Sequence, residues 1–341
     1  MTLTNRIEAV LRAACVGDAL GAATEGMHRD DIINVFGGPV TRLMQPPPLA
    51  PFAAGLAPGR LTDDATQMLA MAEIAIRADG APELRDAIDG LLLWMEDAEM
   101  FARFAGPTTR VALEKLKAGT PAEAVADPGV YSCMFGTSNG GAMRAPVAGC
   151  LRPGNVAEAA RLATVFAAPT HNTAIAFAGS AAVAGAIAFG LGGGDRSGLA
   201  GAALKAAQAG MDLAVAHGRV TGGPDVGRRI ALAVKIGTDY LGRPQAAMTE
   251  LEAIIGNGVA MAEAVPVAFG LVVAAGGSPW QSILAAVNGG NDSDTIAMIA
   301  GAIAAAYGPD DIDPHVAAEV IAVNRLDLAA VAARLNGVAH A

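Results

Sequence analysis

The chain has 341 residues, of which 53% are hydrophobic and only 16% are charged, and its formal net charge is −10. An acidic chain with no polybasic segment argues against binding to nucleic acid or to an anionic membrane surface, because both depend on basic patches. Its three scattered cysteines form no C-x-x-C pair, which is typical of reduced thiols rather than a disulfide framework or a zinc site.

The N-terminal segment indicates in which cellular compartment the protein is found. Arg6, Glu8 and Arg12 interrupt the apolar region that a signal peptide needs, so we expect a cytoplasmic protein. No Ser/Pro-rich linker or run of charge divides the chain into parts. We therefore expect residues 1–341 to form a single large domain.

The next segments predict a loop followed by a helix. Gln45–Pro58 (QPPPLAPFAAGLAP) is too rich in proline to be helical throughout, and we expect a flap that covers a substrate. Ala65–Arg77 carries apolar residues at the spacing of one helical face. Together these residues predict an irregular loop leading into an amphipathic helix.

Further helix starts are frequent, and strand patterns are nearly absent. Four sites combine a capping residue with a proline or an acid of the first turn: Thr120-Pro121, Asn155 with Glu158, Ser278-Pro279 and Asp313-Pro314. Alternating apolar and polar residues with Asn-Gly or Asp-Gly turns do not occur. The pattern predicts an all-α protein of ten or more helices that pack closely through Ala and Gly.

The segment Asn172–Gly194 raises the question of a membrane. It is free of charge and long enough to cross a bilayer, and the mean hydropathy of the chain is +0.41. However, it consists mostly of Ala and Gly and has no flanking belt of basic residues. We expect a buried central helix and no membrane association, with a transmembrane helix as the alternative.

Polar residues gather in four short motifs against this apolar background. They are GDALG at 17–21 followed by Glu25, LTDDAT at 61–66, SNGGAMR at 138–144 with His171 downstream, and GGNDSDTIA at 289–297.

The second and fourth motifs each place carboxylates and a threonine where a helix is expected to begin. Such residues cap helices and interact favourably with the N-terminal end of the dipole. Capping needs one such residue, whereas Asp63 with Asp64, and Asp292 with Asp294, would repel each other unless a cation lies between them. Oxygen ligands without Cys or His favour Mg²⁺ or Mn²⁺ over zinc. Helix capping and a metal site both fit these residues.

The four motifs, in this order and spread over most of the chain, resemble those of the ADP-ribosylglycohydrolase family. That family includes the hydrolase that removes ADP-ribose from dinitrogenase reductase. The resemblance implies an all-α fold, a single large orthogonal helical domain, with a binuclear Mg²⁺ or Mn²⁺ centre. It implies two groups of metal ligands: Thr62, Asp63 and Asp64, and Asp292, Asp294 and Thr295.

The resemblance also implies a reaction. The ribose hydroxyls are held against the metals, and water, oriented by a carboxylate, attacks the anomeric carbon as the glycosidic bond breaks. The catalytic residues that it implies are Asp294, Asp292, Asp64 and Glu25, the last as a residue that gates or orients the site.

Other residues are implied to bind the substrate or to support the site. Asn139, Gly140 and Gly141 correspond to a loop whose backbone N–H groups reach a phosphate, and His171 to a histidine near the ligand. Read without the resemblance, a single histidine in an Ala-rich stretch is more often structural. Arg144 and Asp18 are expected to be structural, the first bridging loops and the second supporting a ligand or a helix end.

One departure from the family pattern concerns the leaving group. Members that act on ADP-ribosylarginine carry a stretch like FDIGxTT, whose Asp lies near the scissile bond. In the matching segment, RFAGPTT at 103–109, Phe104 stands in its place. A phenyl ring cannot pair with a guanidinium by charge, although it can stack on a flat leaving group.

Three functions are therefore considered. The first is a metal-dependent hydrolase of a ribosyl bond, whose substrate is a small ribosyl compound or an ADP-ribosylated target. Phe104 favours the alternative of a nucleoside-type N-ribosidase that acts on a small metabolite in salvage or catabolism. The third is a non-catalytic protein like the eye-lens J1 crystallins, which also resemble the family. The oligomeric state is left open.

Overall fold

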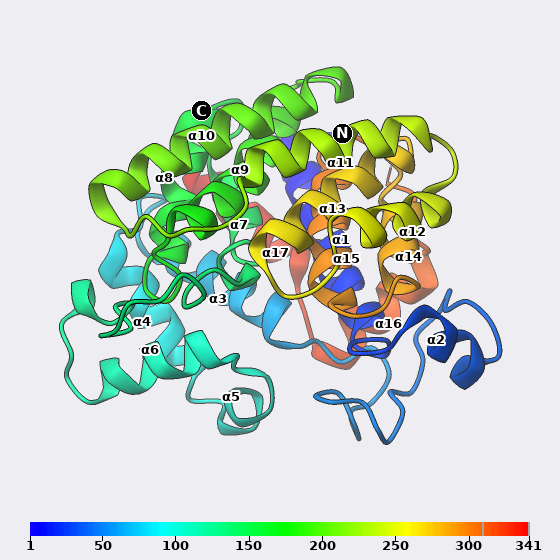
Figure 1. Ribbon diagram of the computed structural model, residues 1–341, viewed down its shortest axis with the longest axis horizontal. Coiled ribbons are helices and arrows are strands. Elements are labelled where there is room, and N and C mark those ends of the chain that lie inside the picture. The colour runs from blue at the N-terminus through cyan, green and yellow to red at the C-terminus, as the bar shows by residue number, and fades with distance from the viewer. Residues whose placement is uncertain (309, 340–341) are drawn as a thin grey trace. The chain divides into compact units, whose positions relative to one another are not determined.

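The structure is a computed structural model that describes residues 1–308 and 310–339, and it is all-helical (Figure 1). Within these residues the only extended pairings are two isolated bridges, Ser138 with Ala260 and Thr173 with Arg219. The all-α prediction is therefore confirmed.

The chain divides into two compact units, each assembled from separate segments. The first consists of Met1–Ala65, Arg229–Val259 and Glu263–Ala332, and the second of Thr66–Arg228, Ala260–Ala262 and the residues from Ala333 onward. A single domain over the whole chain stays a prediction.

Both units consist of helices joined by turns and loops. The first unit contains α1 (Leu3–Gly21), α2 (Arg29–Phe36), α12 (Pro244–Ile254), α14 (Pro279–Val287), α15 (Ser293–Ala305) and α16 (Pro314–Asn324). The second contains α4 (Leu84–Trp94), α5 (Ala98–Phe104), α6 (Pro107–Lys117), α7 (Ala145–Leu151), α8 (Val156–Ala167), α9 (Ala174–Leu191), α10 (Leu199–His217) and the short 3₁₀ helices η1 (Ala122–Ala124), η2 (Asn139–Gly141) and η3 (Arg196–Gly198). Four helices have residues in both units: α3 (Asp63–Arg77), α11 (Val226–Asp239), α13 (Met261–Ala274) and α17 (Leu328–Val338).

In the first unit, α1 and α15 lie side by side although they come from opposite ends of the chain (blue and orange in Figure 1). A Cβ atom on Gly17 would lie 2.5 Å from the carbonyl oxygen of Ala297, and one on Gly21 would lie 2.3 Å from the Cα of Asp294. Only glycine permits this approach of the two backbones. The glycines of GDALG therefore serve helix packing, and they bring α1 against the start of α15.

In the second unit, α9 forms the core and packs against α7, α8 and α10. Thr173 caps it by accepting a hydrogen bond from the Ala176 N–H at 3.2 Å, and every residue of the helix except Phe189 is buried. Among the described residues it is the one helix long and apolar enough to cross a bilayer, and 94% of that span is buried inside the protein. It is the buried central helix expected for Asn172–Gly194.

The helix starts read from the sequence are confirmed at three of four sites, where the capping side chain accepts a backbone N–H: Asn155 of α8, Ser278 of α14 and Asp313 of α16. The fourth was wrong, because the segment after Thr120 forms only the single turn η1. Pro128 disfavours helical backbone at the residue before it, Asp127, so a helix that began here would have little room to lengthen.

The proline-rich segment Gln45–Pro58 forms a series of turns without a helix, as predicted. The Gln45 side chain closes it by donating to the Leu56 carbonyl at 2.6 Å. Ala50 and Ala53 pack on Ala22 in a small apolar cluster. This packing places the segment next to the chain that carries Glu25, while its role as a substrate-covering flap stays a prediction.

Candidate functional site

Asp18, on α1, holds the beginning of α3. Its carboxylate accepts the Thr62 N–H at 3.1 and 3.2 Å, the Thr62 hydroxyl at 2.6 Å and the Ala65 N–H at 3.2 Å. Burial and the nearby Asp294 raise the pKa of Asp18 to about 7, although these hydrogen bonds oppose the rise. The residue thus supports a helix end, as expected, and fixes the segment that contains Asp63 and Asp64.

The second ligand group begins α15 after a sharply turned loop. Gly290 and Asn291 both have positive φ, 69° and 55°. A Cβ atom on Gly290 would lie 2.1 Å from the Met27 carbonyl oxygen, so only glycine fits there. Within the first turn of α15, the Thr295 N–H donates to Asp294 Oδ1 at 2.9 Å and the Thr295 hydroxyl to Asp292 Oδ1 at 3.4 Å.

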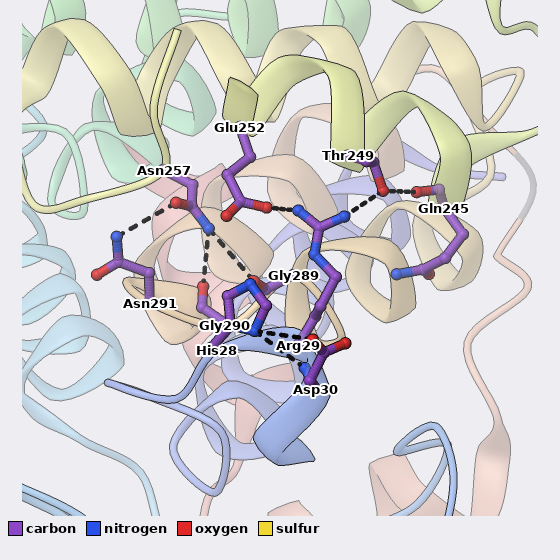
Figure 2. A network of polar contacts seen from close by, with 10 residues as sticks. All are labelled: His28, Arg29, Asp30, Gln245, Thr249, Glu252, Asn257, Gly289, Gly290 and Asn291. Atoms are coloured by element: carbon purple, nitrogen blue, oxygen red, sulfur yellow. Dashed lines mark hydrogen bonds and ion pairs between the residues drawn. The ribbon is translucent and has the colours of Figure 1, made fainter. Parts of the chain in front are cut away.

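Asn257, which follows α12, fixes this loop (Figure 2). Its side-chain amide donates to the carbonyls of Gly289 at 3.3 Å and Gly290 at 3.2 Å, and its amide oxygen accepts from the Asn291 side chain at 3.2 Å. Its backbone carbonyl accepts the Asp292 N–H at 3.2 Å. This role could not be predicted from the sequence, because Asn257 belongs to none of the four motifs.

The same region ties down α2, which follows the Glu25 segment. Arg29, the first residue of α2, forms an ion pair with Glu252 of α12 and donates a hydrogen bond to Thr249 at 2.6 Å (Figure 2). Helix α12 and Asn257, three residues beyond its end, therefore hold both the chain beyond Glu25 and the loop before Asp292.

Glu25 is brought to the start of α15 by backbone pairing. The Gly26 N–H donates to the Asn291 carbonyl and the Asn291 N–H donates to the Met27 carbonyl, both at 2.8 Å. As a result, Glu25, Asp292 and Asp294 each place one carboxylate oxygen within 4.8 Å of the others. This acidic cluster is made by residues more than 260 positions apart in the sequence.

The charges in the cluster repel one another. Burial, then Asp294, Asp292 and Asp63, raise the pKa of Glu25 to about 11. Burial, followed by the negative charges of nearby carboxylates, first Asp294 and then Asp63, raises the pKa of Asp64 well above its ordinary value. Burial raises the pKa of Asp294 to about 6. The predicted ligand carboxylates of both motifs thus act on one another in the same buried region.

Two oxygen atoms in this region have no hydrogen-bond partner: Glu25 Oε2 and Asp64 Oδ2, both buried. Unpaired buried carboxylate oxygens are costly, and a cation satisfies them and the surrounding charge together. The predicted ligands are all carboxylates and hydroxyls, the donors that a hard cation prefers. The residues present therefore fit Mg²⁺ or Mn²⁺.

The third motif forms a separate polar group in the second unit. Asn139, Gly140 and Gly141 make up η2, and a Cβ atom on Gly140 would lie 2.7 Å from Cε1 of His171. The structure thus brings the predicted loop and the predicted histidine together. His171 is 1% exposed, and burial together with Arg144 lowers its pKa to about 3, so its ring is neutral at physiological pH.

Arg144 is fully buried and bridges separate segments, as predicted. Its guanidinium donates to the Gln67 side chain at 2.7 and 2.9 Å, to the Phe166 carbonyl at 3.1 Å and to the Thr170 hydroxyl at 2.9 Å. Phe104 is the last residue of α5 and only 8% exposed. Its ring is largely enclosed by protein, and stacking on a leaving group stays a prediction.

Comparison with known proteins agrees with this arrangement. The family model for ADP-ribosylglycohydrolase matches residues 1–340. Uncharacterized protein YegU of Escherichia coli K12 is 29% identical over 331 residues, covering 95% of this chain and 94% of that protein. An uncharacterized protein of Archaeoglobus fulgidus is 27% identical over 293 residues, covering 86% and 84%.

A solved structure described as an ADP-ribosylglycohydrolase-related protein complex shares the fold. Its TM-score is 0.69 at 22% sequence identity, and the alignment covers 99% of each chain. The match of the family model over almost the entire length decides the assignment: the chain belongs to the ADP-ribosylglycohydrolase family and is a glycohydrolase-like enzyme.

Proposed function

We propose that the protein is a metal-dependent hydrolase that cleaves the glycosidic bond at the anomeric carbon of a ribose. The observation that supports this most directly is the buried acidic cluster, in which Glu25 Oε2 and Asp64 Oδ2 have no hydrogen-bond partner. Structural carboxylates are normally paired with cations or donors. Because this cluster has no such partners for these two oxygens, a bound cation explains it better than a purely structural role.

The residues that would hold the metal form two groups. Thr62, Asp63 and Asp64 lie at the start of α3, and Asp292, Asp294 and Thr295 at the start of α15. When bound, a pair of Mg²⁺ or Mn²⁺ ions supplies Lewis acidity that polarises ribose hydroxyls and lowers the pKa of water. Rigid helix starts suit this role because they hold ligand oxygens in a fixed geometry.

In the reaction we propose, water adds to the anomeric carbon and the bond to the leaving group breaks, with its electron pair going to the leaving nitrogen or oxygen. Carboxylates of Asp64, Asp292, Asp294 and Glu25 orient the water, accept its proton and stabilise positive charge that develops on the ribose. Glu25 hydrogen-bonds Asp294, and burial followed by the neighbouring carboxylates raises its pKa in the metal-free protein, so it is suited to taking up the proton that the water gives off. The proton can then reach the leaving group.

The polar group of the second unit is proposed to bind substrate. Asn139, Gly140 and Gly141 offer backbone donors for a phosphate or another anionic group. Ser138, which is hydrogen-bonded to His171, adds a side-chain hydroxyl beside them. The substrate is then a small ribosyl compound or an ADP-ribosylated target, which the enzyme meets in the cytoplasm.

Phe104 favours a second candidate, a nucleoside-type N-ribosidase. A phenyl ring at this position offers no carboxylate to pair with a guanidinium, so an ADP-ribosylarginine substrate would be recognised less well here than one with a flat base. A non-catalytic, crystallin-like protein is a weaker candidate, because both carboxylate motifs of the cluster are complete.

A release assay separates these candidates. Protein treated with chelator and then supplied with Mg²⁺ or Mn²⁺ is offered ADP-ribosylarginine, ADP-ribosylserine, O-acetyl-ADP-ribose and several purine and pyrimidine nucleosides. We expect release only with added metal, and the best substrate identifies the leaving group. Full activity in metal-free protein would refute metal dependence. Absence of Mg²⁺ and Mn²⁺ binding in a calorimetric titration would favour the non-catalytic protein.

A further inference from the structure

Four side chains in the second unit form a continuous chain of hydrogen bonds. The Arg144 guanidinium donates to Thr170 Oγ1 at 2.9 Å, Thr170 Oγ1 lies 2.7 Å from Nδ1 of His171, and Nε2 of His171 lies 2.7 Å from Ser138 Oγ. Arg144, Thr170 and His171 are buried, whereas Ser138 is partly exposed. The chain therefore runs from the protein interior to an accessible hydroxyl.

The chemistry of these groups fixes the direction of every hydrogen bond. A guanidinium can only donate, so Thr170 Oγ1 must accept from Arg144. The Thr170 hydroxyl then has its own hydrogen to place, and Nδ1 of His171 is the acceptor within reach. The opposite arrangement, with a hydrogen on Nδ1, would leave the hydrogen of the buried Thr170 hydroxyl without an acceptor, which is unfavourable.

The orientation at Ser138 follows from this. With Nδ1 as an acceptor, a neutral imidazole carries its hydrogen on Nε2 and donates it to Ser138 Oγ. The doubly protonated ring is disfavoured by burial and by the positive charge of Arg144. Ser138 Oγ accepts from His171, so its own hydrogen points elsewhere. His171 is the hydrogen-bond partner of this hydroxyl among the described residues.

We propose that Arg144 and Thr170 are positioning residues that fix His171 as the neutral Nε2–H tautomer, so that Ser138 presents its hydroxyl hydrogen to an acceptor oxygen of the ligand. Gly140 belongs to the same arrangement, because a side chain there would collide with the imidazole. An anionic oxygen, as in a phosphate or carboxylate, is the acceptor that such a donor favours. The ligand half of this proposal rests on the proposed function, whereas the tautomer half does not.

The tautomer can be measured directly by ¹⁵N NMR of protein labelled at its five histidines. The His171 resonances are assigned as those that disappear in His171→Gln. We expect an unprotonated Nδ1 and a protonated Nε2 at pH 7. In Thr170→Val, which removes the hydroxyl but keeps the shape, the preference should be lost, and in Thr170→Ser it should be retained. A protonated Nδ1 in the wild type, or unchanged resonances in Thr170→Val, would overturn the proposal.

Thr164→Val is the matched control. Thr164 is also buried, lies on α8 of the same unit, and uses its hydroxyl to donate to the Arg161 carbonyl at 2.7 Å. It should lose stability to a similar extent as Thr170→Val while leaving the His171 resonances unchanged. A change of tautomer in this control would show that general destabilisation, rather than Thr170, governs the ring.

Calorimetric titration with ADP-ribose in the presence of Mg²⁺ tests the ligand half. Ser138→Ala and Thr170→Val should each weaken binding by about tenfold, the usual effect of one lost hydrogen bond, while Thr170→Ser binds like the wild type. Unchanged affinity in both variants would overturn the role of Ser138. If the tautomer is as expected but the wild type binds no ADP-ribose and shows no activity, the proposed function fails and the positioning of His171 stands.

Discussion

Replacing Asp294 with asparagine should stabilise the metal-free protein at neutral pH. Asp294 is 4% exposed, and burial raises its pKa from the ordinary 3.8 to about 6. A carboxyl whose pKa is higher in the folded state contributes its full stability below pH 3.8 and loses it as the pH rises through 6. At ~1.4 kcal/mol per pH unit, the loss amounts to about 3 kcal/mol above pH 6.

Asparagine does not titrate, so the variant should not suffer this loss. The change also removes a charge that raises the pKa of both Glu25 and Asp64, which adds to the difference in the same direction. Urea unfolding of both proteins in chelator, at several values between pH 4 and pH 8, measures the effect. The difference in the free energy of unfolding, variant minus wild type, should increase by about 3 kcal/mol from pH 4 to pH 8.

Added Mn²⁺ should reverse the order. The ion should stabilise the wild type by binding the folded state, most strongly at high pH where the carboxyls are ionised, and it should stabilise Asp294→Asn much less. Parallel stability curves for the two proteins from pH 4 to pH 8 would refute the view that Asp294 is held in an unfavourable buried environment. Equal stabilisation of both by Mn²⁺ would refute its assignment as a ligand.

Three further predictions concern packing, the loop and the histidine. Gly21→Ala should lower the free energy of unfolding by about 1–3 kcal/mol and weaken Mn²⁺ binding, because its Cβ would lie 2.3 Å from the α15 backbone. The control Gly201→Ala, whose Cβ would have no atom within 4 Å, should be neutral or stabilising in thermal unfolding. Asn257→Asp puts a carboxylate against two carbonyls and should weaken Mn²⁺ binding in a calorimetric titration. The control Asn155→Ala removes the cap of α8 at a cost of about 1 kcal/mol in stability and should leave Mn²⁺ binding unchanged. The pKa of His171 is about 3 in the folded protein and 6.5 in the unfolded chain, so the unfolded state binds more protons between these values, and stability is lost as the pH falls below 6.5. Urea unfolding of His171→Gln should therefore show a weaker loss at low pH than the wild type, and an equally steep loss would contradict the buried neutral ring.

Several helices could be predicted from short sequence patterns. Capping side chains such as Ser278 and Asp313 are read from a few neighbouring residues, so their helices could be placed correctly. The prediction of a helix after Thr120 was wrong because a capping pattern indicates where a helix begins but not how far it continues, and here the chain forms only a single turn. The carboxylate motifs could be identified as candidates, yet their meeting depends on the packing of α1 on α15, which no local pattern contains.

Residues that act only by hydrogen-bonding other residues of these polar sites are not predictable from the sequence. Asn257 holds the loop before Asp292 with a side chain that has no distinctive neighbours in the sequence. Thr170 lies next to His171 but bonds it through a side-chain geometry that sequence spacing does not reveal. Such roles are set by tertiary structure, since any Asn or Thr can fill them wherever the fold supplies the partners.

The pairing of α1 with α15 also constrains how the protein is made. During synthesis, α1 emerges well before α15, and the apolar residues that α1 buries against α15 cannot be covered by it until Ser293–Ala305 has been translated. Contacts between chain ends form slowly because a long loop must close first. Until then these apolar residues lack their native partner, a condition that favours aggregation. Neither the helix nor the acidic cluster beside it can be completed before the last part of the polypeptide appears.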